Sequence, residues 1–267
     1  MNPKPLPNHS KHKTEMSELF SQPASMNEFS VTQLKNKTRQ LVNYDPMLCY
    51  IAFGAMASLQ YDIDQVHAQF KMALHTAGAD AWIVQLYAIA LNNICLPYEA
   101  SDLLMEYQSY YPNEFSLLRD SIESCVNTGR AFRGEALLAH WHKLTDMANP
   151  YETTIQQWAD FYRRHDFTES QVQPILETAL SLVRQSLKSN GFFLISTGYA
   201  NYDGAPYLYY TIHIDLPVDD LLELEEQHND LLLTGNFKES LLDNIIITFE
   251  HLTVEKKAAV EESLVYG

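Results

Sequence analysis

The sequence lacks long apolar runs and has few basic residues. No stretch reaches the roughly 20 apolar residues that cross a bilayer, and Met1 to Thr14 carries Lys and Pro without the apolar centre of a secretory signal. Only 18 Lys and Arg stand against 34 Asp and Glu, a formal net charge of −16. Such a surface repels phosphate backbones, so we expect no direct nonspecific nucleic-acid binding, no membrane partner, and a preference for basic proteins.

Cysteines and catalytic motifs are scarce as well. The three cysteines, Cys49, Cys95 and Cys125, are odd in number, and each lies within an apolar helical pattern. This usage predicts buried, reduced thiols and a cytoplasmic protein. The chain has no phosphate-binding loop, dinucleotide fingerprint, zinc-protease helix or Cys-x-x-Cys. The sequence therefore predicts no cofactor and no metal, and it favours a protein without enzymatic activity.

The central part of the chain repeats itself. A shift of 34 residues superposes similar residue classes, as in the column Gly54, Ala88 and Ile122. The pattern predicts three helix pairs, at 47–59 and 63–77, at 81–94 and 98–110, and at 114–128 and 132–144. A period near 34 with paired helices is typical of a helical-repeat array.

Residues 47–146 resemble a degenerate tetratricopeptide repeat. The matching positions are Gly54, Phe70, Ala73, Ala100 and Pro112, whereas Tyr107 and Trp141 replace small residues. The resemblance implies that the first helix of each pair lines a concave groove suited to peptide recognition. It assigns to this groove Trp82, Gln85, Ile89 and Asn92 from the second pair, Ser116, Arg119 and Glu123 from the third, and Ile51 and Ala55 from the first.

The pattern changes after two further helices, predicted at 151–164 and 169–188. From Gly191 the period is alternating, which predicts strands near 193–199 and 207–216 joined by a turn at Tyr202-Asp203-Gly204. A helix at 217–232, a short helix at 236–242, a strand at 244–250 and a terminal helix at 253–264 follow. We expect the third strand to run parallel to the second and beside the first.

The expected fold class is α+β, with a polar leader at 1–29, a tetratricopeptide-like helical domain at 30–190, and a small β-β-α-β domain at 191–267. This last segment holds 14 acidic and three basic residues. Because three strands and one helix make a thin core, we expect the sheet to pack on the 169–188 helix or on a second subunit, as a homodimer.

Several polar clusters contain the residue types found in metal or catalytic sites. The side chains of His140 and His142 point about 200° apart on a helix, so they cannot both coordinate one metal ion. The acidic side chains of the 217–232 helix point in different directions, so they do not converge on one cation. Those near its N-terminal end interact favourably with the positive end of the helix dipole. Two pairs, Asp64 with His67 and His165 with Asp166, have the residue types of acid–base catalysis. Neither pair has a recognisable nucleophile nearby, so we interpret both as structural.

A second surface patch is predicted on the strand face with Tyr207, Tyr209 and His213, either exposed for a partner or covered by helices. The sequence thus favours an acidic interaction module: an adaptor, a chaperone, or a neutralising partner of a basic protein, as in an antitoxin or immunity protein. One alternative is an enzyme whose site combines His213, Asp215 and the Arg163-Arg164-His165 cluster where the array meets the sheet. Another is a regulatory protein whose C-terminal part binds a small ligand.

Overall fold

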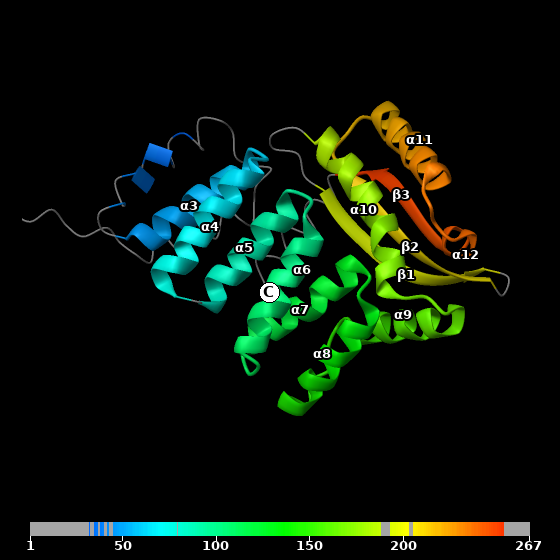
Figure 1. Cartoon of the computed structure of the whole chain (residues 1–267), viewed down its shortest axis with the longest axis horizontal. Coiled ribbons are helices and arrows are strands. Elements are labelled where there is room, and N and C mark those ends of the chain that lie inside the picture. Colours follow the sequence, from blue (N-terminus) through cyan, green and yellow to red (C-terminus); the bar gives the residue numbers. More distant parts are fainter. Residues whose placement is uncertain are drawn as a thin grey trace, which may run out of the picture. The chain divides into compact units, whose positions relative to one another are not determined.

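A computed structural model describes residues 45–78, 80–187, 193–202 and 205–253, together with six positions between 32 and 42 (Figure 1). The described residues form ten helices and three strands in a mixed α+β arrangement, which confirms the predicted fold class. Two compact units are present. Described residues up to Ile94 belong to the first unit, and residues 95–187 and 193–253 belong to the second. No described helix combines the length and apolar character needed to cross a bilayer.

The first unit contains α3 (Pro46–Leu59), α4 (Ile63–Ala77) and α5 (Ala81–Asn93). Pro46 begins α3 at a position where its missing N–H costs nothing, and Asp45 caps that end. Helices α3 and α4 approach closely at Gly54, where an added Cβ would lie 2.6 Å from the Phe70 ring. Gly54 therefore allows the close approach of these two helices.

The second unit begins with α6 (Pro97–Tyr110), α7 (Phe115–Thr128) and α8 (Ala131–Leu144), and continues with α9 (Glu152–His165) and α10 (Glu169–Ser186). Helices α4, α6 and α8 begin at Ile63, Pro97 and Ala131, which are 34 residues apart in each case. The 34-residue helical repeat read from the sequence is therefore present. A capping box precedes α10, with the Thr168 N–H donating to Gln171 Oε1 at 2.9 Å.

The sheet comprises β1 (Phe193–Tyr202), β2 (Ala205–Ile214) and β3 (Ile245–His251), with α11 (Val218–Thr234) and α12 (Glu239–Leu242) between β2 and β3. β1 and β2 pair antiparallel from Phe193↔Ile214 to Tyr202↔Ala205, as predicted. Of the predicted turn, Asp203 and Gly204 lie outside the described residues. So do the polar leader and nearly all of the predicted 253–264 helix.

One prediction about the sheet is wrong. β3 is parallel to β2, as expected, but the strand order is β1-β2-β3, so β3 lies beside the second strand and not beside the first. The β1–β2 hairpin leaves one edge of β2 unpaired, and the crossover through α11 returns the chain to that edge. This order makes β2 the central strand, which fits the buried row of Leu208, Tyr210, Ile212 and Ile214.

One face of the sheet carries this buried row and packs against helices of the same unit. The indole of Trp158 on α9, which is fully buried, lies 5.4 Å from the ring of Tyr210 on β2. On α11, the ring of His228 meets that of Phe249 on β3 edge-to-face at 5.7 Å. Helix α11 also contacts α10. The sheet thus shares a core with α9 and α11, and α10 adjoins α11.

The cysteines provide a test of packing in each unit, with Cys49 in the first and Cys95 and Cys125 in the second. All three are buried and unpaired. Burial and the nearby Asp45 carboxylate raise the pKa of Cys49 to about 11, and burial raises that of Cys125 to about 12. At pH 8 we therefore expect reaction with an aromatic disulfide reagent to be at least about 100-fold slower in the native protein than in guanidinium chloride, because the thiolate is the nucleophile.

The same pKa shift makes stability depend on pH. An unfolded thiol ionises near its ordinary pKa of 9.0, whereas the folded thiols keep their protons to higher pH. This contribution to stability is complete below about pH 8 and declines as the pH rises from about 9 toward 12. Native-state labelling of all three cysteines at the denatured rate would contradict their burial.

Candidate functional site

Helix α5 has a single accessible stripe. Trp82, Gln85 and Asn92 are half-buried, and Ile89 is 37% exposed. The buried positions of the helix are Ile83, Val84, Leu86, Tyr87, Ala88, Ala90 and Leu91. The accessible residues follow the three- and four-residue spacing of one helix face. The four residues assigned to the groove from the sequence are thus the accessible stripe of α5.

Two local interactions set the direction in which this stripe faces. The side chain of Asp80 accepts a hydrogen bond from the Trp82 N–H at 2.8 Å, which fixes the first turn of α5. On the buried side, the ring of Tyr87 stacks on Phe70 of α4 at 4.9 Å, and its hydroxyl lies 2.5 Å from His67 Nδ1. Tyr87 therefore anchors α5 to α4 and leaves Trp82 and Gln85 on the outer side.

Helix α7 repeats this pattern 34 residues later. Ser116 and Glu123 are half-buried and Arg119 is exposed, whereas Leu118 and Ile122 are buried. Arg119 Nε lies 3.3 Å from Asp120 Oδ1. Burial raises the pKa of Glu123, and a hydrogen bond with Tyr151 partly opposes this effect. The α7 residues lie in the second unit, so the groove residues predicted from sequence are divided between the two units.

The first helix pair departs from this pattern. Ile51 and Ala55 on α3 were expected in the groove, but they are 0% and 1% exposed. The expectation was wrong because nearly the whole circumference of α3 is apolar, so the helix is buried on several sides. The accessible stripe is a property of α5 and α7.

The second predicted patch lies on the sheet face opposite the Leu208–Ile214 row. Tyr207, Tyr209 and Thr211 are half-buried there, whereas His213 is only 3% exposed. Tyr209 lies across Gly198 on β1, where any Cβ would overlap its ring. Ile246 on β3 is 41% exposed on the same face. The face is thus accessible and carries both apolar and polar side chains around a buried histidine.

His213 connects to two residues that the sequence reading did not single out. Its Nε2 lies 2.9 Å from Ser196 Oγ on β1, and its Nδ1 lies 3.3 Å from Glu250 Oε2 on β3. The signal was present in the alternation of all three strands. However, finding it required the register of the strands and their order, and the third strand was expected beside the first strand instead of the second.

The residues of the predicted enzyme site are not brought together. His165 packs on Phe161 at 4.4 Å, and Phe161 packs on Tyr199, whose side chain shares a sheet face with the Leu208–Ile214 row. His213 is on the opposite face. Arg163 forms an ion pair with Glu135 instead, and Asp215 is exposed just beyond β2. These groups cannot act on one substrate.

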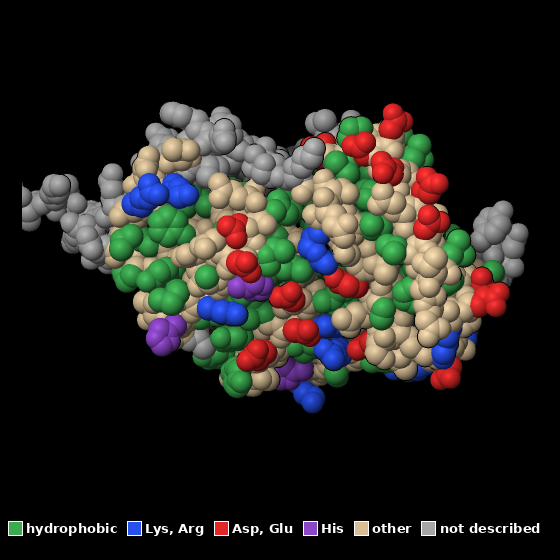
Figure 2. Space-filling view, turned by 45° about the horizontal axis from the view of Figure 1, so that its top comes forward, with side chains coloured by type: hydrophobic (Ala, Val, Ile, Leu, Met, Phe, Trp, Pro, Cys, Tyr) green, Lys and Arg blue, Asp and Glu red, His purple; other side chains and the backbone are tan. Residues whose placement is uncertain are grey.

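The remaining polar clusters have separate partners. His140 Nε2 lies 2.6 Å from the Pro112 carbonyl, and His142 Nε2 lies 3.2 Å from Glu152 Oε1. Among the described residues no group of three His, Cys, Asp or Glu side chains could hold a metal ion. Acidic side chains gather over the α11 region (Figure 2), where those exposed are Asp219, Asp220, Glu223, Glu226 and Asp230.

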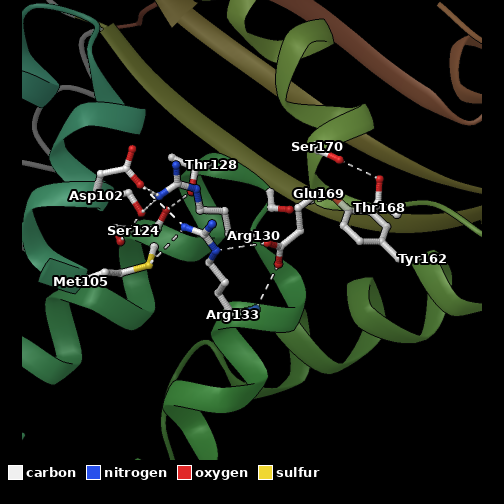
Figure 3. A network of polar contacts seen from close by, with 12 residues as sticks. Asp102, Met105, Ser124, Thr128, Arg130, Arg133, Tyr162, Thr168, Glu169 and Ser170 are labelled. Carbon is white, nitrogen blue, oxygen red and sulfur yellow. Dashed lines mark hydrogen bonds and ion pairs between the residues drawn. The ribbon is translucent and has the colours of Figure 1, made fainter. Parts of the chain in front are cut away.

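A buried arginine forms a further network within the second unit (Figure 3). Arg130 Nη1 donates to Asp102 Oδ1 at 2.6 Å and to Ser101 Oγ at 3.0 Å, and its guanidinium lies 5.4 Å from the centre of the Tyr98 ring. Arg133 binds Glu169 at the start of α10. The network connects α6 with the start of α8, and α8 with α10, so its role is structural.

Comparison with protein-family models, with curated proteins and with solved structures finds no significant match. The site is therefore interpreted from its own geometry.

Proposed function

We propose that this chain is an acidic interaction protein that binds a segment of a partner protein through the accessible stripe of α5. The observation that carries the proposal is that, between its two terminal residues Ala81 and Asn93, α5 is buried except along Trp82, Gln85, Ile89 and Asn92. An aromatic anchor, an aliphatic residue and two amides on one rigid helix face form the mixture that recognises peptides. The large side chains supply contact area, and the amides pair with the peptide backbone.

The charge of the chain favours a basic partner. A net charge of −16 attracts a cationic segment and raises its rate of association, and this attraction weakens as salt screens it. Adaptor, chaperone and neutralising functions all use such a surface. The three buried thiols without disulfides are consistent with a reducing compartment, so we propose a cytoplasmic location.

The test is affinity purification of the full chain from the cells that make it, at low and at high salt. We expect a bound protein from wild type that is lost with Trp82→Ala. Once it is identified, its affinity should fall at least about 30-fold, because truncating an aromatic anchor typically costs 2 kcal/mol or more. The matched control is Met72→Ala, which truncates a 43% exposed apolar side chain on α4 of the same unit.

Three results would argue against the proposal or part of it. Equal losses with Trp82→Ala and Met72→Ala would remove the special role of the stripe. Binding that is unchanged between low and high salt would remove the electrostatic part. No bound protein in any sample would leave the interaction function without support.

A further inference from the structure

Ser196, His213 and Glu250 form a row across the three strands of the sheet. His213 and Glu250 are register partners in the parallel β2–β3 ladder. His213 faces Leu194 across the antiparallel β1–β2 ladder, which places Ser196 diagonally beside it on the same face. The result is a continuous contact chain from hydroxyl to imidazole to carboxylate, with distances of 2.9 Å and 3.3 Å.

The carboxylate determines which nitrogen of neutral His213 carries the proton. Glu250 can only accept a hydrogen bond, so Nδ1 must donate to it. The opposite tautomer would direct the Nδ1 lone pair at a negative charge. Nε2 is then left with a lone pair that accepts the hydrogen of Ser196 Oγ. This is the arrangement in which an imidazole acts as a general base toward a hydroxyl and is oriented by a third group.

Exposure differs along the row in the way that such chemistry requires. Ser196 is exposed and reachable by a substrate, whereas His213 is 3% exposed and shielded from water. The side chain of Glu250 is 53% exposed, so water screens part of its attraction for the imidazole when His213 takes up a proton. Leu194 precedes Ser196 on the same face, and Tyr209 lies over the neighbouring Gly198. The apolar acyl group of a substrate could therefore pack on Leu194 and Tyr209, beside the Ser196 hydroxyl.

We propose that Ser196 is a nucleophile that accepts an acyl group from small carboxylic esters, with His213 as its general base and Glu250 as a positioning residue. The Ser196 Oγ lone pair forms a bond to the ester carbonyl carbon as its proton moves to His213 Nε2. The bond from that carbon to the alcohol oxygen then breaks, and Nε2 returns the proton to the departing alcohol. Water, deprotonated by His213, releases the acyl group as a carboxylic acid. Because the chain has a formal net charge of −16, which repels anions, neutral esters are preferred over anionic ones as substrates.

The full-length protein should be assayed with p-nitrophenyl acetate, and separately with a fluorophosphonate probe followed by peptide mapping. In the probe reaction Ser196 Oγ bonds to phosphorus and fluoride leaves. We expect the label on Ser196, and we expect Ser196→Ala to reduce the acylation rate at least about 100-fold, the usual range for a base-assisted nucleophile. Thr248→Val is the control, because Thr248 lies on the same sheet face and contacts Thr211 instead of His213.

A purely structural hydrogen-bond chain gives different results. Glu250→Gln keeps the size and acceptor oxygen of Glu250 but removes its charge, so we expect labelling to slow at least about 10-fold with no change in thermal midpoint. His213→Gln tests the base directly, and Ser196→Ala remains decisive if that variant does not fold. Labelling elsewhere, equal hydrolysis by wild type and Ser196→Ala, or an unchanged labelling rate in Glu250→Gln would each overturn the assignment.

Discussion

Replacing Gly129 with alanine should lower the free energy of unfolding by about 3 kcal/mol. Gly129 ends α7 in the left-handed conformation, with φ of +67°, where an L-residue costs roughly 1 kcal/mol. An added Cβ would also lie 2.5 Å from the Tyr210 hydroxyl and 3.2 Å from that of Tyr162. Overpacking of this kind costs about 1–3 kcal/mol more. Urea unfolding at constant pH measures the total.

A double-mutant cycle separates the two causes. Tyr210→Phe removes the hydroxyl that the new Cβ would meet first, so Gly129→Ala should cost only about 1 kcal/mol in that background, because mainly the backbone term remains. Equal costs in the two backgrounds would show that the α7–α8 connection does not press on the sheet at Tyr210.

Removing Asp102 should destabilise the protein by about 2 kcal/mol, although its side chain is 63% exposed. The reason is its partner: Arg130 has only 6% of its side chain exposed, and it would be left with a buried charge facing Ser101 and the Tyr98 ring alone. Stranding a buried charge costs roughly 3–5 kcal/mol. Access of water to the Asp102 site reduces that figure. Denaturant unfolding of Asp102→Ala tests it.

Two variants complete this experiment. Asp160→Ala removes an exposed carboxylate 3.2 Å from the half-exposed Arg163, and it should change stability by less than about 0.5 kcal/mol. The double variant Asp102→Ala/Arg130→Met should be more stable than the sum of its single changes predicts, because no unpaired charge remains. Strict additivity would mean that the pair contributes no coupling energy.

Much of the fold could be predicted from local patterns. Helix starts at Pro46, Pro97 and Asp80 follow from proline and capping chemistry, which depends on neighbouring residues only. The accessible stripe of α5 followed from the 34-residue period, because one repeat predicts which positions of the next are buried. The burial of Ile51 did not follow, because α3 is apolar on nearly every side and its sequence does not distinguish a groove face.

The row on the sheet could not be predicted in the same way. Ser196, His213 and Glu250 are separated by 17 and 37 positions, and no local pattern connects them. Their meeting depends on β3 pairing with β2 rather than with β1, a choice made by the crossover through α11 and by the apolar face of β2. Strand alternation alone assigned His213 to the correct face but named no partner for it.

Site-specific photo-crosslinking tests most directly whether the stripe of α5 binds a partner. A photoreactive residue is placed at position 89 in the stripe or at position 72 on α4, two exposed apolar positions of the same unit. After irradiation in the producing cells, we expect a discrete crosslinked protein from position 89. That crosslink should be absent from position 72 and lost when Trp82→Ala is added. Equal crosslinking from both positions, or none from position 89, would contradict a partner-binding function for the stripe.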